Sequence, residues 1–400
     1  MRRALLAGAV AAIAATALLL GGALRSEDRA SAAPTTRQLV RFGLAELEAA
    51  RTGDPARYVR AELALRRALA DDPNDVHTLI GLASLANSRH KFRDGLVLAR
   101  RAQRASPDTA QTYAAVGDSL VELGRYDEAF ATFDRLADLK PGVASYSRTS
   151  YALELLGQIR PAIGAMALAA DAAGGQGASA AFARVHLGKL HFSVGRLDAA
   201  AREYRAALRA VPGHVEALDG LAHVAAARGR LTVAIRLERQ AAERNPLPQY
   251  VGALGDVYRA AGKPQLAREQ YELVGAIDRL YAANGVATDL ELALFNVDHG
   301  IRLRESLARA RRAHSERPSI EADGVLAWAL QRNGRCGEAL GYSKRALRLG
   351  TLDAPKFFHR GMIERCLGHD AEARRWFRRA LRLNPHFSRV WAPVARKAVA

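Results

Sequence analysis

The sequence has few of the residues that build small disulfide-rich domains or cysteine-based metal sites. Its 400 residues include two cysteines, Cys336 and Cys366, three methionines and three tryptophans. Two cysteines exclude a disulfide-dense scaffold and a four-cysteine metal site. Aromatic residues make up only 6% of the chain, but 49% of it is apolar and 25% is charged. This balance is typical of a globular chain and excludes an intrinsically disordered one.

Basic residues outnumber acidic ones along the whole chain. Lys and Arg number 59 against 41 Asp and Glu, which gives a formal net charge of +18 at pH 7. Most of the basic residues are Arg. Either GC-rich codon usage or selection for an anionic partner explains this excess of Arg. Length alone predicts two or three domains of about 100–200 residues each.

The first 34 residues carry the features of an export segment. Arg2 and Arg3 precede an uncharged apolar stretch at 4–24, and Ala30-Ser31-Ala32 offers a small-residue cleavage site. These features are typical of a secretory signal peptide. A stretch of about 20 apolar residues can also cross a bilayer as an uncleaved signal anchor. We expect either a signal peptide or a signal anchor at 1–34, with the remainder exported and either secreted or held at the outer face of the cytoplasmic membrane.

An internal repeat of about 34 residues fills the rest of the chain. Glycines recur at gaps of 33, 34 or 38 residues, and prolines recur at gaps of 34 over part of the same region. The glycines are Gly124, Gly157, Gly195, Gly229, Gly262, Gly300, Gly334 and Gly368, and the prolines are Pro73, Pro107, Pro141, Pro212, Pro246 and Pro385. Self-similarity at such a period is the signature of a repeat architecture.

Each repeat has the apolar spacing of two helices. Between 110 and 141, apolar residues at helical spacing end at Gly124, and a second apolar series with Ala129 and Phe133 ends before Pro141. Glycine tolerates the positive φ of a helix C-terminus, and proline cannot continue a helix. Gly117 and Ala129 are small enough for the two helices to approach closely. The sequence therefore predicts a chain of helical hairpins, each burying one side against its neighbours.

The pattern resembles the tetratricopeptide repeat. Its Leu, Gly, Ala, aromatic and Pro positions are matched in phase over nearly all of the chain from residue 36. The matching series include Leu187-Gly188-Gly195-Ala200-Tyr204-Ala207-Pro212, Leu254-Gly255-Tyr258-Gly262-Ala267-Tyr271 and Phe357-Gly361-Gly368-Ala373-Phe377-Ala380-Pro385. The resemblance implies an all-α, right-handed superhelical solenoid of about ten hairpins at 35–385. Residues 386–400, with Trp391, are expected to form a C-terminal capping helix.

The resemblance also implies a concave groove lined by first helices. The groove would hold a protein or peptide partner whose identity the sequence does not give. The candidate groove residues are Asn87, Asp118, Tyr151, Lys189, His223, Asp256, Trp328 and Met362. An aromatic within a helix is more often core than contact, which leaves the roles of Tyr151 and Trp328 open. The family's two-carboxylate clamp for acidic chaperone tails is not found in phase.

No catalytic constellation is present in the sequence. It has no glycine-rich phosphate loop, no metal-binding His pair of the known motifs and no nucleophile elbow. The 11 His are scattered and are expected to be solvated. We therefore expect a non-enzyme with no catalytic residues, no cofactor and no metal.

The two cysteines are expected to approach each other. Cys336 would begin the second helix of the ninth hairpin, and Cys366 would lie near the end of the first helix of the tenth. In a stack of antiparallel hairpins these positions fall at the same edge. A disulfide needs Cα atoms within about 7 Å. We expect a possible disulfide, with two small buried thiols as the alternative.

Positive charge concentrates near the C-terminus. The basic residues Arg374, Arg375, Arg378, Arg379 and Arg382 share one predicted helix, with Trp376 among them. A basic face attracts anionic partners such as lipid headgroups, cell-wall polymer or an acidic segment. Attachment to an anionic membrane or wall surface, assisting envelope assembly or transport, is the alternative to groove binding. A merely solvated Arg face remains open, and nucleic acid is disfavoured by export.

Two repeats depart from the regular pattern. The seventh is expected to have an extended second helix through 276–284, and the eighth, 288–318, is the most degenerate.

Overall fold

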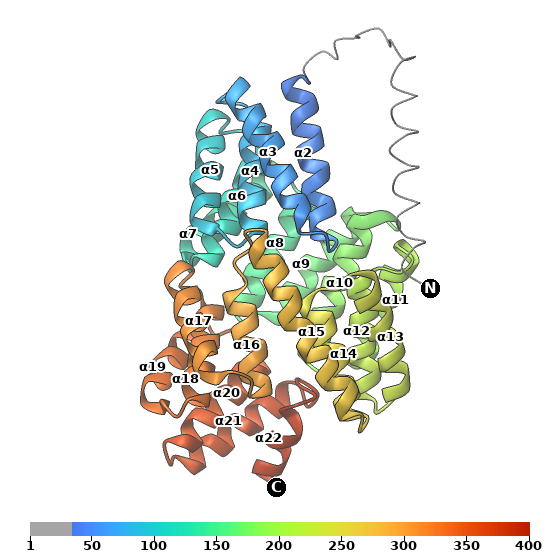
Figure 1. Cartoon of the computed structure of the whole chain (residues 1–400), viewed down its shortest axis with the longest axis vertical. Coiled ribbons are helices and arrows are strands. Elements are labelled where there is room, and N and C mark those ends of the chain that lie inside the picture. Colours follow the sequence, from blue (N-terminus) through green and yellow to red (C-terminus); the bar gives the residue numbers. More distant parts are fainter. Residues whose placement is uncertain (1–33) are drawn as a thin grey trace, which may run out of the picture.

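The structure is a computed structural model that describes residues 34–400. Within these residues the chain forms 21 helices and no strand. Twenty helices pair as ten antiparallel hairpins, and one helix follows at the C-terminus (Figure 1). The helices are α2 (Thr36–Arg51), α3 (Ala56–Asp71), α4 (Val76–Ser88), α5 (Phe92–Ala105), α6 (Ala110–Glu122), α7 (Tyr126–Leu139), α8 (Val143–Leu155), α9 (Ile159–Ala172), α10 (Gly177–Ser193), α11 (Leu197–Ala210), α12 (Val215–Ala227), α13 (Leu231–Arg244), α14 (Pro248–Ala260), α15 (Pro264–Ala283), α16 (Asp289–His299), α17 (Leu303–Glu316), α18 (Ile320–Arg332), α19 (Cys336–Ala346), α20 (Ala354–Cys366), α21 (Asp370–Leu383) and α22 (Ala392–Val399).

The predicted all-α superhelical stack is confirmed. The glycine series marks the turns between the two helices of successive hairpins, and all eight glycines adopt positive φ, for example +71° at Gly124. An L side chain at this backbone conformation is strained, which explains why glycine keeps the period. The same turn in the hairpin α4–α5 is made by His90, at φ 59°. The glycine series therefore misses this earlier hairpin.

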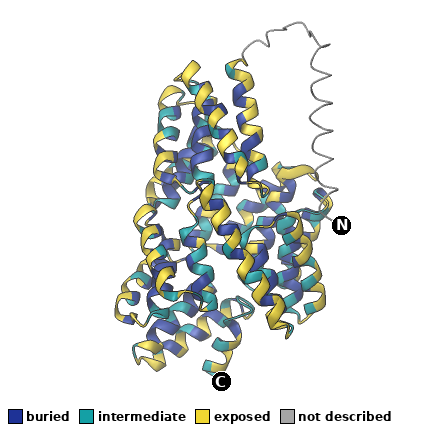
Figure 2. Cartoon of the chain, viewed as in Figure 1, coloured by how far each residue is buried: buried dark blue, intermediate teal, exposed yellow. Residues whose placement is uncertain are grey.

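Small residues bring the two helices of a hairpin together. A Cβ placed on Gly117 of α6 would lie 2.3 Å from the ring of Phe133 on α7. Ala129 is fully buried in the same contact region. Buried residues lie on the sides of the helices that face neighbouring helices, and exposed residues lie on the outside (Figure 2). The close helix approach expected from the small residues is confirmed.

The stack winds so tightly that its second turn contacts its first. The backbone N–H of Ile320 donates to the Tyr126 hydroxyl at 2.8 Å, across 194 residues. The side-chain amide of Asn384 donates to the carbonyl of Phe192 at 2.8 Å, across 192 residues. His90 contacts the carbonyl of Ala287 at 2.8 Å, across 197 residues. One superhelical turn thus takes about 195 residues, and the two turns contact each other.

The C-terminal cap is shorter than expected. Residues 386–391 are not helical, and α22 begins only at Ala392, with Pro393 in its first turn. Proline suits the first turn of a helix, where its missing N–H leaves no bond unmade. The non-helical segment carries Trp391 back over α18, so it contributes to the core as well as covering the last hairpin.

The expected long second helix of the seventh hairpin is confirmed as α15, which has 20 residues. The degenerate eighth repeat folds as the hairpin α16–α17. The expected export segment at 1–34 lies outside the described residues except for Pro34. Among residues 34–400, every helix falls short of the length and apolarity that a membrane crossing requires.

Candidate functional site

A large cavity lies between the two turns of the superhelix. Its volume is about 1330 Å³. It is lined by α12, α14, α15 and α16, by the end of α4 and by the C-terminal segment that precedes α22. The cavity wall mixes apolar groups such as Phe295 and Phe387 with carboxylates, imidazoles and three guanidinium groups. A cavity of this size exceeds the roughly 300–1,000 Å³ of a typical small-molecule pocket.

The eight predicted groove residues all lie on first helices, but only His223 and Asp256 line this cavity. Four others lie elsewhere on the first helices. Asp118 pairs with Arg148 at 2.6 Å, Lys189 pairs with Glu216, and Asn87 accepts a hydrogen bond from Ser119 at 3.0 Å. Tyr151 is 37% exposed. The groove roles of these residues stay predictions.

The prediction that Trp328 and Met362 face a ligand is corrected by the structure. Trp328 is fully buried, and its indole N–H donates to Asp298 at 2.9 Å. Its ring stacks on His359 and meets Trp391 edge-on, with ring centroids 5.4 Å apart. Met362 is buried in the same core cluster. The return of the C-terminal segment over the last hairpins sets Trp391 against Trp328.

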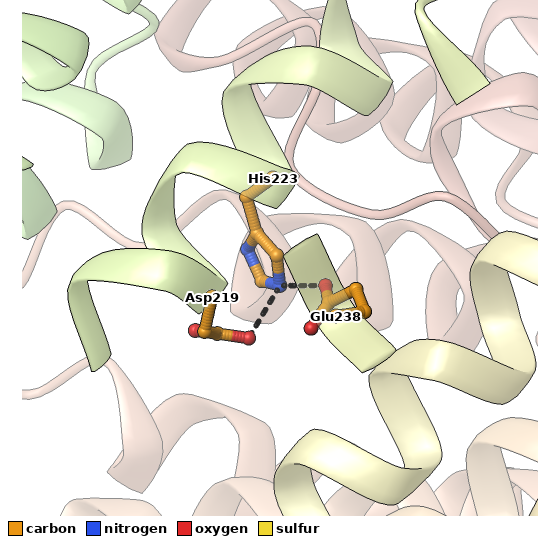
Figure 3. Close-up of side chains that lie close together, drawn as sticks. All are labelled: Asp219, His223 and Glu238. Atoms are coloured by element: carbon orange, nitrogen blue, oxygen red, sulfur yellow. Dashed lines mark ion pairs between the residues drawn. The ribbon is translucent and has the colours of Figure 1, made fainter. Parts of the chain in front are cut away.

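Three polar side chains converge at the cavity wall (Figure 3). Asp219 and His223 lie one turn apart on α12, and Glu238 faces them from α13 of the same hairpin. His223 Nε2 lies 3.5 Å from Asp219 Oδ1 and 3.8 Å from Glu238 Oε1. Arg389, from the segment before α22, donates to Glu238 Oε1 at 2.9 Å. The cluster thus links the sixth hairpin to the C-terminal segment.

Burial governs the protonation of this cluster. It lowers the pKa of His223 to about 4, although Asp219 opposes the shift, so the imidazole is neutral at neutral pH. Burial also raises the pKa of Glu238 well above its usual range, and Asp219 reinforces that shift while Arg389 opposes it. The His223 side chain is 37% exposed, but the exposed part faces the cavity and not the outer surface. The ring is therefore still surrounded by protein, which lowers its pKa.

Glu238 occupies a position that four other hairpins fill with an aromatic ring. The buried face of α13 consists of Ala234, Glu238 and Ala241. These residues have the same spacing as Ala129, Phe133 and Leu136 in α7. In α11, α15 and α21 the matching position holds Tyr204, Tyr271 and Phe377. A fully buried carboxylate at a core position of a repeat conflicts with the local pattern, and such conflicts concentrate at functional sites. This interruption is the sequence signal that could have revealed the cluster.

A second polar group faces the cavity from α14 and α16. His299 Nε2 lies 2.7 Å from Asp256 Oδ1, and the Tyr271 hydroxyl donates to the same oxygen at 2.7 Å. Burial alone would raise the pKa of Asp256, but the bonds from His299 and Tyr271 lower it overall. Burial raises the pKa of Asp298, beside His299, to about 6. The Tyr271 hydroxyl and both His299 ring nitrogens already have hydrogen-bond partners, so this group has no free donor for a ligand.

The two cysteines are bonded in the structure. Cys336 at the start of α19 and Cys366 at the end of α20 have Cα atoms 6.1 Å apart. The bond joins the ninth and tenth hairpins at one edge of the stack, where the hairpin geometry predicts it.

The predicted basic face lies on α21. Arg374, Arg375, Arg378, Arg379 and Arg382 are all exposed. Arg375 pairs with Glu372, whereas the other four make no ion pair within residues 34–400. Arg379 lies over the rings of Phe357 and Trp376, at 4.2 and 5.2 Å. The residues form a solvated cationic strip along one helix.

Models of the tetratricopeptide repeat match residues 80–144, 186–247 and 354–387. These segments cover 161 of the 400 residues. Their matches span the beginning, middle and end of the stack and support this repeat family for the chain. Proteins of the tetratricopeptide repeat family are generally non-catalytic scaffolds for protein interactions. No curated protein matches the sequence of this chain.

Solved tetratricopeptide repeat structures are similar to this one. A chain of the APC/C hetero-tetramer Cut9–Hcn1 aligns over 73% of this chain and 56% of its own, with 18% identity and a TM-score of 0.50. A thermophilic repeat protein of Thermus thermophilus covers 48% of this chain and 98% of its own, with 22% identity and a TM-score of 0.42. A repeat protein of Parabacteroides merdae covers 62% of this chain and 99% of its own, with 15% identity and a TM-score of 0.43. At these identities the likeness concerns the fold alone.

Proposed function

We propose that this chain is a non-catalytic scaffold that holds a segment of a partner protein in its central cavity. The observation that supports this function is the cavity of about 1330 Å³ between the superhelical turns, which contains two of the predicted groove residues. Repeat stacks bind partners on their inner surfaces. Here the inner surface is only partly enclosed by the second turn, and we expect recognition of a chain end or a narrow extended segment.

The charges in the cavity favour a partner segment that carries basic residues. Five carboxylates line the wall against three guanidinium groups, and Arg389 is already paired with Glu238. The carboxylates are Asp219, Asp256, Asp278, Glu291 and Asp298. Complementary charge contributes mainly to specificity and to the rate of association. Apolar groups of the same wall would contact the aliphatic parts of the segment.

We place this scaffold on the outer side of a cytoplasmic membrane. The apolar segment at 4–24 supports export, and the Cys336–Cys366 bond supports an oxidising compartment. Disulfides persist mainly in secreted, periplasmic or surface proteins. Whether the leader is cleaved decides between a secreted and an anchored form.

Filling the cavity tests this function. Peptides selected from a random library on the full chain should bind the Ala253→Trp variant about tenfold or more weakly, a loss of about 1.4 kcal/mol or more. Ala253 lines the cavity and is half-buried. Ala131→Trp, on the exposed side of α7, is the matched control and should bind normally. Equal binding by both variants would remove the cavity from the function.

The exposed cationic strip of α21 supports a second function, attachment to an anionic lipid or cell-wall surface. Changing Arg374, Arg378 and Arg382 to Gln should abolish salt-sensitive binding to vesicles that contain anionic lipid. The same changes at Arg202, Arg205 and Arg209, which are exposed on α11, form the control. Unchanged binding by the α21 variant would leave the strip as a solvated face.

A further inference from the structure

We propose that Asp219, His223 and Glu238 bind one Zn²⁺ ion at the cavity wall. An imidazole nitrogen and carboxylate oxygens are the ligands that Zn²⁺ takes in proteins, at about 2.0–2.2 Å. The ligand atoms of Asp219, His223 and Glu238 lie within 4.8 Å of one another. Two of the ligands come from one turn of α12 and the third from the paired helix α13, so a single hairpin holds the whole set.

The separations of the three side chains fit a metal site. Ligands at about 2.0–2.1 Å in a tetrahedron lie roughly 3.3 Å from one another. His223 Nε2 is 3.5 Å from Asp219 Oδ1 and 3.8 Å from Glu238 Oε1. The three ligand atoms span up to 4.8 Å, and Arg389 already bonds to Glu238 Oε1, so the Glu238 carboxylate must turn to bring Oε2 to the ion. No rearrangement of the helices is needed, because the side chains already point at one another (Figure 3).

Glu238 supplies a second observation, independent of the ligand spacing. Its side chain is 0% exposed, and in the ionised form its Oε2 oxygen has no hydrogen-bond donor in the described part of the chain. Leaving a buried acceptor unpaired destabilises the folded chain. The equivalent positions of four other hairpins hold Phe or Tyr, which would fill this space without that cost. A cation is the partner that the orphaned oxygen lacks.

Arg389 fits this arrangement as a positioning residue. It donates to Glu238 Oε1 and leaves Oε2 free. Hydrogen bonds to the outer oxygen of a ligating carboxylate orient it toward the metal. The positive guanidinium also repels a nearby cation, so its presence sets the affinity below that of a site with three ligands alone. Because Asp219 and His223 line the cavity, the fourth coordination position opens into it.

The mixed ligand set selects the class of ion. Carboxylates with one imidazole suit Zn²⁺ and other first-row divalent ions better than Mg²⁺ or Ca²⁺, which take oxygen ligands alone. Affinity among divalent ions follows ligand chemistry, with Zn²⁺ above Mn²⁺ at sites of this kind. The site needs no bound peptide, so its test is independent of the proposed scaffold function.

The test is a Zn²⁺ titration of the full chain, stripped of metal with a chelator and carrying no histidine tag. Calorimetry should show one Zn²⁺ per chain, with Mn²⁺ binding more weakly. His223→Gln and Asp219→Asn should each weaken Zn²⁺ binding by about tenfold or more, the scale seen when metal sites lose even a supporting group. His77→Gln is the matched control, because His77 is exposed on α4 and lies outside the cavity.

The variants also separate a ligand role from a structural one. Far-UV circular dichroism and the melting temperature of each metal-free variant establish that it folds, and His223→Gln is the primary variant because its ring faces the cavity. Arg389→Gln should raise Zn²⁺ affinity, because it removes a repelling charge beside Glu238, and unchanged affinity would place the ion away from Glu238. The proposal is overturned if the folded wild type binds no Zn²⁺ at one per chain, or if His223→Gln and His77→Gln bind it equally.

Discussion

The side-chain amide of Asn384 donates to the carbonyl of Phe192 at 2.8 Å, joining the end of α21 to the end of α10 across 192 residues. The same side chain accepts from the backbone of His386 at 2.8 Å and so fixes the start of the C-terminal segment. Asn384 is 2% exposed. This amide is therefore one of the bonds between the two superhelical turns, and it also fixes the segment that lines the cavity.

Replacing Asn384 with Ala should loosen the contact between the turns. The change leaves buried groups unpaired, so the free energy of unfolding should fall by about 1–3 kcal/mol, and small-angle scattering should show a larger radius of gyration. Asn333→Ala is the control, since Asn333 bonds to Leu303 in the preceding hairpin, 30 residues away. It should cost stability without expanding the stack. Equal expansion of both variants would contradict the role of Asn384 between turns.

Gly117→Ala should destabilise the third hairpin. The added Cβ would meet the Phe133 ring at 2.3 Å, and overpacking of this kind costs about 1–3 kcal/mol. Gly164→Ala in α9 is the control, because nothing lies within 4 Å of its Cβ position. There Ala should stabilise by up to about 1 kcal/mol. Urea unfolding of both variants measures the difference, and similar values would mean that close helix approach is unimportant.

Removing the disulfide should cost stability but preserve the fold. The bond spans 30 residues, and a loop of that size contributes about 3–4 kcal/mol through the entropy of the unfolded chain. The Cys336→Ser, Cys366→Ser double variant should therefore unfold at lower urea concentration. Intact mass of the native protein with and without reductant checks the bond itself. Two alkylatable thiols in native material would contradict it.

Stability should fall as pH rises toward neutrality because of Glu154. Burial raises its pKa to about 7, and Asp353 and Glu321 add to the shift while Lys356 opposes it. Between the ordinary value of 4.5 and about 7, the folded chain holds a proton that the unfolded chain releases, so raising the pH favours unfolding. Glu154→Gln should thus be more stable than the wild type near pH 8 and gain nothing near pH 4.

The control for this pH effect is Glu243→Gln, at an exposed position of α13. Thermal unfolding of the three proteins across pH measures the effect. A constant difference between Glu154→Gln and the wild type at every pH would show that the substitution acts through packing and not through ionisation.

Several features of the site could be expected from the sequence. The hairpin positions of Cys336 and Cys366 brought them to one edge, and the helical spacing of the α21 arginines placed them on one exposed strip. Trp328 could not be assigned, because its burial depends on tertiary contacts with His359 of α20 and with Trp391 of the C-terminal segment. The cluster of Asp219, His223 and Glu238 was not predicted, because scattered His residues are typical of a solvated surface. The signal for it was Glu238, which stands where four other hairpins have an aromatic residue.

The sequence alone determined the hairpin, since a turn glycine such as Gly124 and a terminating proline such as Pro141 act within one repeat. It also determined the number of hairpins, because each repeat carries its own signals. Only the tertiary structure decided how tightly the hairpins wind. The small rotation between neighbours depends on the packing of many side chains, and it accumulates over the stack until residues about 195 positions apart touch. That accumulated winding created the partly open cavity between the turns and set Arg389 against Glu238.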